Sequence, residues 1–225
     1  TFVISLGGSI VAPEKPDSSF LSAFAQLIRR HITDTGSRFI LVVGGGGPAR
    51  AYQQAYRELV DNPEKNEQDW IGIAATRLNA QLIRGIFHDL SPQPVVIDPS
   101  VVDHFEGSVL VAAGWKPGHS TDYIAVKLAE KQAVTKVINL SNIDYVYTKD
   151  PAQYPDAQPI QSITWPDFRQ MVGETWDPGA SAPFDPIASK ESEHLGLEVA
   201  ILNGENLTNL DHYLSQKDAV GTIIS

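Results

Sequence analysis

Cysteine is absent from this chain of 225 residues. The chain can therefore form neither a disulfide framework nor a metal site built on thiolates, and its composition fits a reducing compartment. It also lacks any apolar run of the roughly 18–20 residues that a membrane-spanning helix requires. The segment Thr1–Leu6 carries none of the basic residues that open a signal peptide. We therefore predict a cytoplasmic protein that has no membrane segment.

Positive charge is scarce, because 17 Lys and Arg residues stand against 27 Asp and Glu residues and give a formal net charge of −10. This balance argues against a broad surface for nucleic acid or for an anionic membrane. It still allows a small phosphate ligand, since such ligands are usually held by local backbone N–H groups and one or two cations. We expect no nucleic-acid partner.

Short apolar segments alternate with longer helical patterns, and 42% hydrophobic residues are enough for a sizeable core. The order of strands and helices predicts an α/β fold with a mostly parallel sheet and helices on both faces. The expected helices run from Asp17 or Ser18 to about His31, from about Pro48, from Trp70 to His88 and from Thr121 to Lys131. The expected strands are Phe2–Leu6, Phe39–Val43, Pro94–Ile97, Val109–Ala112, Thr135–Leu140, Glu198–Leu202 and Thr222–Ile224.

Two stretches interrupt this alternation. Residues 61–68 are polar and predict a connection without regular structure, and residues 148–186 hold seven of the chain's 15 prolines and predict an irregular lobe. Trp165 and Trp176 are expected to pack inside that lobe. Nothing between the stretches resembles a linker, so we predict one domain over residues 1–225. Its two lobes, about 1–116 and about 117–225, would share the sheet.

Two glycine-rich loops each follow an apolar strand. The loop with Gly7, Gly8 and Ser9 could offer N–H groups to phosphate oxygens, although taken alone it reads as a tight turn. The segment 44–47 holds four consecutive glycines and leads into a helix through Pro48, an arrangement that favours an anion at the helix N-terminus. Arg50 falls in the first turn of that helix and could add a bidentate phosphate contact.

A third loop joins a strand to a helix through Gly114–Asp122. Ser120 and Thr121 are suitable both as helix N-caps and as hydrogen-bond donors to phosphate. Asp122 could orient a hydroxyl group, hold Mg²⁺ through water or complement the helix dipole. His119, as an isolated histidine, is more typical of a structural role.

Two later segments carry polar residues at the expected ligand edge of the sheet. In Asn139–Pro151, Tyr147 could line a pocket for a base and Asp150 could bond a ribose, and a polar turn with a packed tyrosine is an equally good reading. In Phe184–Lys190, Asp185 and Pro186 are typical of a helix start, and Lys190 is typical of a surface residue.

Taken together and in this order, these five segments resemble the amino-acid-kinase family, with the closest likeness to its archaeal-type UMP kinases. The likeness also includes Gly8–Asp17, Trp70–Ala80 and Gly221–Ile224, so it runs nearly end to end. The resemblance implies a three-layer α/β/α sandwich and transfer of the γ-phosphoryl group of ATP to UMP in pyrimidine nucleotide biosynthesis. It further implies a homo-oligomer, commonly a hexamer built as a trimer of dimers, with the long third helix as a dimer face.

The resemblance also implies roles for single residues. The acceptor would bind in the N-terminal lobe and Mg-ATP in the C-terminal lobe, with Mg²⁺ held by the ATP phosphates and by no protein ligand that we can name. UMP would contact Gly44, Gly45, Gly46, Arg50, Asp69, Ser120 and Thr121. ATP would contact Gly7, Gly8, Ser9, Asn142, Asp144, Tyr147, Asp150, Asp185 and Lys190. The residues closest to the transfer itself would be Gly8, Ser9, Arg50, Lys116 and Asp122.

The sequence departs from the family pattern at two lysines. Many members carry a lysine two residues before the first Gly-Gly, where this chain has Ser5, and some archaeal-type members carry one at the position of Gly47. Lys116 is a hypothetical replacement, and a solvated surface lysine is the equal alternative. Two other functions therefore stay open. One is a kinase of this fold with another acceptor, such as another nucleoside monophosphate, isopentenyl phosphate or an amino acid. The other is a nucleotide-binding protein whose catalysis is weakened or lost.

Overall fold

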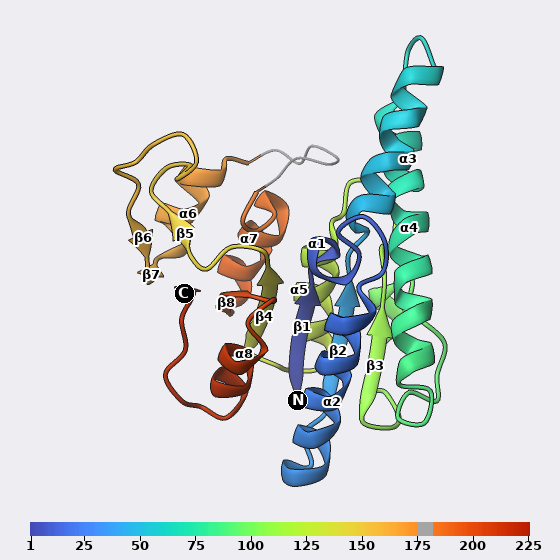
Figure 1. Ribbon diagram of the computed structural model, residues 1–225, viewed down its shortest axis with the longest axis vertical. Helices are drawn as coiled ribbons and strands as arrows, with labels where there is room; N and C mark the ends of the chain where they lie inside the picture. Colours follow the sequence, from blue (N-terminus) through green and yellow to red (C-terminus); the bar gives the residue numbers. More distant parts are fainter. Residues whose placement is uncertain (175–181) are drawn as a thin grey trace.

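A seven-stranded sheet, in the order β3-β2-β1-β4-β8-β9-β7, forms the centre of the computed structural model, which describes residues 1–174 and 182–225 (Figure 1). Strands β1, β2, β3, β4 and β8 are parallel, β9 is antiparallel to β8, and β7 is parallel to β9. The prediction of a mostly parallel sheet is therefore confirmed. The strands are β1 (Phe2–Leu6), β2 (Phe39–Val43), β3 (Val109–Ala112), β4 (Lys136–Ser141), β7 (Ser162–Ile163), β8 (Glu198–Asn203) and β9 (Thr222–Ile224), and β5 (Val146–Tyr147) pairs with β6 (Pro159–Ile160) in a separate antiparallel ribbon.

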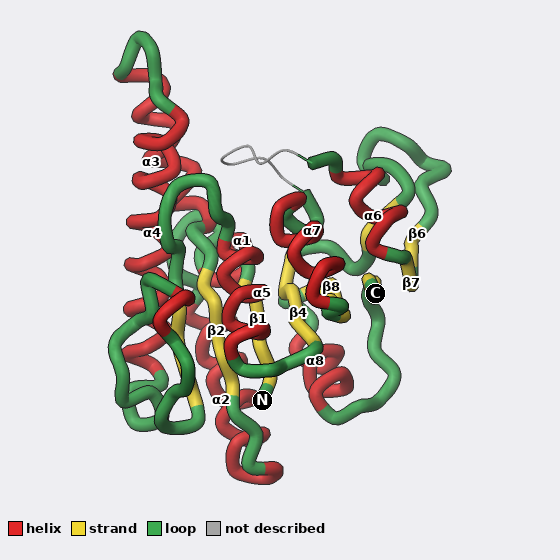
Figure 2. The backbone as a smooth tube through the Cα atoms, turned by 180° about the vertical axis from the view of Figure 1, so that it is seen from behind, coloured by secondary structure: helices red, strands yellow, loops and turns green. Residues whose placement is uncertain are grey.

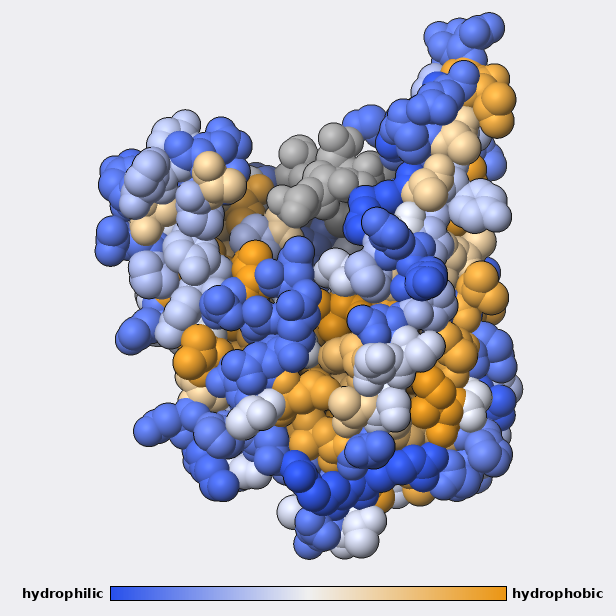
Figure 3. Space-filling model, viewed as in Figure 1, coloured by the Kyte–Doolittle hydropathy of each residue, from blue (hydrophilic) through white to orange (hydrophobic). Residues whose placement is uncertain are grey.

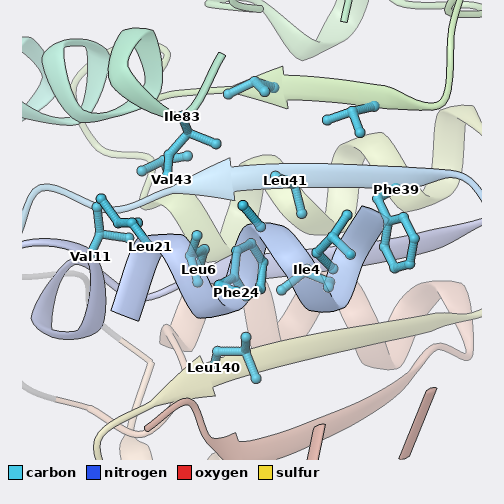
Figure 4. Packing of buried hydrophobic residues seen from close by; sticks show 14 of the residues in the cluster. Ile4, Leu6, Val11, Leu21, Phe24, Phe39, Leu41, Val43, Ile83 and Leu140 are labelled. Carbon is cyan, nitrogen blue, oxygen red and sulfur yellow. The ribbon is translucent and has the colours of Figure 1, made fainter. Parts of the chain in front are cut away.

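Helices cover both faces of the sheet, so the predicted three-layer α/β/α sandwich is also confirmed. On one face α2, α4 and α8 bury residues such as Phe24 and Ile83 against Ile4 and Leu6 of β1 (Figure 4). On the other face α5, α6 and α7 pack against the alternate residues of the same strands. The helices are α1 (Gly8–Val11), α2 (Ser18–Thr35), α3 (Gly46–Leu59), α4 (Lys65–Ile86), α5 (Thr121–Lys131), α6 (Trp165–Val172), α7 (Pro186–Leu195) and α8 (Leu207–Leu214).

The N-terminal signals of three helices act as the sequence suggests. The side chain of Asp17 accepts hydrogen bonds from the N–H groups of Ser19 and Phe20 and caps α2. Ser120 caps α5 through the N–H of Tyr123. Asp185 caps α7 through the N–H of Ala188, with Pro186 in the first turn. These caps fix where α5 and α7 begin, and both helices begin at the same edge of the sheet.

Three of the sequence-based assignments are wrong. Residues 94–97 contribute only an isolated bridge from Val96 to Ala112, because Pro94 at its start and Pro92 before it have no N–H for a ladder. The segment 61–68 is not wholly a connection, since α4 already begins at Lys65 among residues that favour helix. The lobe 148–186 is less irregular than predicted, since it contains α6, which Thr164 caps. The expectation that Trp165 packs there is confirmed, because it is buried against Phe168 and Phe184; Trp176 lies outside the described residues.

The hairpin of α3 and α4 projects beyond the sheet, at the end of the molecule opposite the N-terminus, in both ribbon views (Figure 1 and Figure 2). Its outer surface carries large hydrophobic side chains, seen as orange patches along the hairpin in Figure 3. Leu59 is 84% exposed, Leu78 71% and Tyr52 70%. None of the described helices is long and apolar enough to cross a membrane.

Candidate active site

The loops that follow β1, β2, β3 and β4 meet at the carboxyl edge of the parallel strands, where open α/β sheets bind their ligands. There they enclose a cavity of about 510 Å³ whose lining contains many polar side chains. Most of the predicted acceptor residues line it, together with part of the predicted ATP loop. The lining residues are Gly8, Ser9, Gly45, Gly46, Ala49, Arg50, Gln53, Asp69, Gly72, Ile73, Thr76, Gly114, His119, Ser120, Thr121, Ser141, Asn142 and Ala182.

The two glycine loops pack backbone against backbone. A Cβ atom on Gly8 would lie 2.0 Å from the nitrogen of Gly46, and one on Gly44 would lie 2.4 Å from the nitrogen of Gly8. Gly46 also has a φ of +67°, which L side chains rarely adopt. Glycine is therefore required here for steric reasons as well as for access to a ligand. Gly7 and Gly44 support the loops from beneath and do not line the cavity.

Three helices begin at this cavity. The start of α1 contributes Gly8 and Ser9, the start of α3 contributes Gly45 and Gly46, and the start of α5 contributes Ser120 and Thr121. The first N–H groups of a helix have no intrahelical acceptor, and the helix dipole makes this end favourable for an anion. The cavity is therefore suited to groups that carry several negative charges, such as phosphates.

The acceptor-side residues are placed by two elements. Arg50, on the first turn of α3, is exposed and donates to the carbonyl of Pro13 at 3.3 Å. Asp69, on the first turns of α4, is buried and accepts the N–H of Gly118 at 2.7 Å. This bond joins α4 to the loop that leads into α5. Asp69 therefore helps to position the cavity-lining residues that follow Gly118 in the chain.

Asp122 lies behind the cavity at the centre of a hydrogen-bond network. Its carboxylate accepts the hydroxyl of Ser5 at 2.8 Å, the amide of Asn139 at 3.3 Å and the N–H of Asp185 at 3.2 Å. Burial, together with the nearby Asp185 carboxylate, raises the pKa of Asp122 to about 7. Ser5 thus serves as a hydrogen-bond donor to Asp122.

Asp185 is the second buried carboxylate in this network. Burial raises its pKa, while the N–H groups at the start of α7 and the Ser120 hydroxyl oppose that change. Two neighbouring buried carboxylates whose pKa values are raised in this way favour a bound cation or a shared proton. The described residues contain no group of three or more His, Asp or Glu side chains that could hold a metal ion by themselves.

The remaining predicted ATP residues do not share one enclosed cavity. Asn142 lines the cavity described above, and Asp144 accepts the side-chain amide of Asn203 at 2.9 Å. Tyr147 lies on β5 with its ring edge-on to Tyr145. Asp150 accepts the N–H of Ala152 and the side chain of Gln153, which is the polar-turn arrangement that the sequence also allowed. Lys190 is exposed on α7.

Lys116 lies apart from the other residues predicted for catalysis. Its side chain is exposed, its ammonium nitrogen lies 3.8 Å from the centre of the Trp115 ring, and it does not line the cavity. The nearby carboxylate is Asp98, whose pKa is lowered mainly by hydrogen bonds from Ser100 and in part by Lys116. The position of Lys116 is that of a surface lysine stacked on an aromatic ring.

Four polar side chains of the cavity wall were not among the predicted site residues: Gln53, Thr76, His119 and Ser141. Gln53 is buried on α3 and donates to the carbonyl of Gln68 at 3.0 Å. His119 lies between the rings of Trp115 and Tyr123, at centroid distances of 5.2 and 4.7 Å. Gln53 sits four residues after Ala49 on the face that α4 covers, a helical spacing that the sequence displays. The placement of His119 depends on the fold of its loop.

A second cavity, of about 600 Å³, lies at the outer edge of β3. It is lined mainly by apolar residues between Pro92 and Leu110. It lacks the glycine loops, the helix N-termini and the buried carboxylates that converge on the first cavity. We therefore assign the candidate active site to the carboxyl edge of the sheet.

Comparison with known proteins gives consistent results. The model of the amino acid kinase family matches residues 1–203. The chain is 33% identical to a uridylate kinase from Hyperthermus butylicus, covering 99% of this chain and 97% of the relative. It is 31% identical to a uridylate kinase from Thermoplasma volcanium, covering 100% and 97%.

Solved structures agree with these relatives. A uridylate kinase from Archaeoglobus fulgidus superposes with a TM-score of 0.81 at 30% identity, covering 100% of this chain and 99% of that one. A UMP kinase from Bacillus anthracis gives a TM-score of 0.80 at 20% identity, covering 100% and 95%, a likeness that concerns the fold.

Proposed function

Because the chain belongs to the amino acid kinase family, we propose that it transfers the γ-phosphoryl group of ATP to UMP and so produces UDP and ADP. The observation that carries this proposal is the convergence of three helix N-termini on one polar cavity of about 510 Å³. Both substrates are polyanions, and this is the place in the described structure where backbone N–H groups and an arginine gather. The near full-length likeness to uridylate kinases supports UMP as the acceptor.

Phosphoryl transfer of this kind needs alignment and charge stabilisation more than covalent help from the protein. UMP phosphate is itself the nucleophile, and it is ionised near neutral pH, so no strong general base is required. The start of α3, with Gly45, Gly46 and Arg50, would hold the UMP phosphate, and Ser120 and Thr121 would donate to it from α5. Gly8 and Ser9 would hold the transferred phosphoryl group from the neighbouring loop. The negative charge that spreads over that group would then face fixed N–H dipoles.

The buried carboxylates fit a magnesium ion that arrives on the phosphates of ATP. One oxygen of Asp185, Oδ2, is buried without a hydrogen-bond partner within the described part of the chain, and Asp122 has a pKa raised by burial and by Asp185. Hard oxygen ligands of this kind suit Mg²⁺, which keeps several waters. When bound, the ion would neutralise charge on the ATP phosphates. Since neither carboxylate lines the cavity, Asp122 and Asp185 would meet it through water.

Arg50 is our candidate for the charge that the missing lysines would supply. Arg50 and His119 are the basic side chains among the described residues that line the cavity. Gly47 leaves no room for a lysine, because a Cβ atom there would lie 2.1 Å from the carbonyl oxygen of Pro13. Two hydrogen bonds hold the segment 12–14 against this loop. The N–H of Gly47 donates to the carbonyl of Ala12, and the Arg50 side chain donates to the carbonyl of Pro13. The hypothesis that Lys116 replaces the missing lysines is not supported by its exposed position.

We further propose that residues 1–116 bind mainly UMP and residues 117–225 mainly ATP. The sheet is continuous across this division, with β3, β2 and β1 from the first part and β4, β8, β9 and β7 from the second. Asn142, Asp144, Tyr147, Asp150 and Lys190 lie in the second part and would surround the nucleotide. We also propose that the chain forms a homo-oligomer built from dimers, with a hexamer as its full form, and that it is located in the cytoplasm.

The test is release of ADP from Mg-ATP in the presence of a panel of acceptors. The panel contains UMP, CMP, dUMP, AMP, GMP, isopentenyl phosphate and N-acetylglutamate. Turnover that is at least about tenfold faster with UMP than with any other acceptor is the expected result. Faster turnover with another acceptor would overturn the choice of UMP and leave the kinase reaction. No turnover across the panel, from protein that binds ATP and UMP, would instead indicate a nucleotide-binding protein.

A further inference from the structure

One turn of α4, Thr76–Asn79, bonds to both loops on the acceptor side of the cavity. Asn79 is 3% exposed, and its side-chain amide donates to the carbonyl of Gly44 at 2.9 Å and to that of Gly45 at 3.0 Å. Both acceptors belong to the glycine loop before α3. The two hydrogens of a single amide group thus hold two consecutive peptide groups of this loop.

The same turn holds the loop that leads into α5. The hydroxyl of Thr76 accepts the N–H of Gly114 at 2.8 Å and donates to the carbonyl of Ile73 at 2.7 Å. Arg77 donates to the carbonyl of Gly114 at 3.2 Å and to that of Trp115 at 2.8 Å. Three residues of one helix, Thr76, Arg77 and Asn79, therefore fix the backbone of two loops that are about seventy residues apart in the chain.

The direction of these bonds bears on the ligand site. In a trans peptide the N–H points opposite to the C=O. Since Asn79 holds the carbonyls of Gly44 and Gly45, the N–H groups of Gly45 and Gly46 point away from it. Neither of these N–H groups forms a hydrogen bond with another described residue, and both glycines line the cavity. Asn79 thus orients two free donors without touching the ligand.

The stability of α4 does not account for Asn79. Asparagine is a poor helix former in a helix interior, and a buried side-chain amide loses its hydration unless it is hydrogen-bonded. A leucine at this place would suit the helix and its buried apolar neighbours on α4, Ala80 and Ile83, better. What asparagine adds is a pair of donors aimed at the glycine loop.

We propose that Asn79 and Thr76 are positioning residues for the acceptor phosphate: they set the orientation of the glycine loop and its distance from the start of α5. The inference rests on the proposed function, because it assumes that the glycine loop and Thr121 hold the phosphate of UMP from two sides. A displacement of about 1 Å between such groups costs on the order of 100-fold in rate. One rigid helix that bonds to both loops prevents that displacement.

The test compares steady-state kinetics of four variants. Asn79→Leu removes both donors, and Asn79→Asp places an acceptor against two carbonyls. Both variants are expected to raise KM for UMP about 10- to 100-fold and to change KM for ATP about threefold or less. Thr76→Val removes the hydroxyl at constant shape and is expected to act in the same direction, whereas Thr76→Ser restores most of the loss. Binding of UMP alone, measured by calorimetry, should weaken in parallel.

Ile83→Val is the matched control. Ile83 is buried on the same helix next to Val43, which precedes the glycine loop (Figure 4). This variant should lower the melting temperature without changing KM for UMP. A merely structural role of Asn79 would lower the folded fraction, and thus kcat, while KM stays at the wild-type value; that outcome would overturn the inference. Wild-type protein that does not phosphorylate UMP would contradict the proposed function instead, and calorimetry with UMP would still decide whether Asn79 orders the loop.

Discussion

At the scale of the residue, the cavity depends on backbone groups and on a few side chains with fixed partners. The glycines are required because the two loops touch through their backbones, as the 2.0 Å between a Cβ on Gly8 and the nitrogen of Gly46 indicates. Two groups of charged residues carry predictions, Arg50 in the cavity wall and the Asp122 and Asp185 carboxylates behind it. Each group leads to a different prediction.

Arg50 and Lys116 form a matched pair of basic residues, one inside the cavity wall and one outside it. Arg50→Ala is expected to lower kcat/KM for UMP about 100-fold, because a charge-assisted contact to the phosphate would be lost. Lys116→Ala is expected to change it about threefold or less. Steady-state kinetics with UMP varied at saturating Mg-ATP checks both values. A large loss in Lys116→Ala would restore the hypothesis that Lys116 replaces the missing lysines.

Asp122 predicts how stability depends on pH. Its pKa is about 7 in the folded chain and near 3.8 in the unfolded one, so unfolding releases a proton between these values. The stabilising contribution of protonated Asp122 is fully present below about pH 4 and is lost as the pH rises through 7. Each unit of difference between the folded and unfolded pKa corresponds to about 1.4 kcal/mol in the free energy of unfolding. Asp122→Asn should therefore flatten the decrease of Tm between pH 5 and pH 8. If Tm fell with pH at the same slope in wild type and variant, the raised pKa of Asp122 would be contradicted.

At the scale of the element, the starts of α2, α5 and α7 are encoded locally by a capping side chain that the sequence displays. The side chain of Asp17, which does not line the cavity, caps α2 by accepting from the N–H groups of Ser19 and Phe20. Asp17→Ala is expected to cost about 1 kcal/mol of stability and to leave kcat and both KM values unchanged. Chemical denaturation and steady-state kinetics measure the two quantities. Loss of activity without loss of stability would show that the turn before α2 belongs to the site.

The elements that the sequence predicted are those with strong local signals. The apolar runs of β1, β2 and β3 and the capped starts of α2, α5 and α7 were predictable because their determinants are adjacent in the chain. The short α1 and the interrupted segment 94–97 were not, since their structure depends on packing against Gly46 and on the edge of β3. The same holds for the candidate site. The glycine loops could be predicted from the sequence, but the bonds of Asn79 to Gly44 and of Thr76 to Gly114 could not, because they join segments that are distant in the chain.

At the scale of the whole molecule, the α3–α4 hairpin presents more hydrophobic surface than an isolated chain needs. Tyr52, Leu59 and Leu78 are 70% or more exposed, and the hairpin carries no other element on its outer side within the described structure (Figure 3). We predict that this surface lies between copies of the chain. Leu59→Lys combined with Leu78→Lys should reduce the molar mass in light scattering to that of a smaller assembly. An unchanged mass would place the contact elsewhere.

The central claim is that the cavity at the carboxyl edge of the sheet is where UMP receives a phosphoryl group. The most direct measurement follows the reaction of UMP with Mg-ATP by ³¹P NMR in the presence of the purified protein. It compares wild type with Arg50→Ala at equal folded fraction. The account predicts that the resonances of UDP and ADP grow together in the wild type and about 100-fold more slowly in the variant. Absence of UDP in the wild type, or equal rates in both proteins, would contradict it.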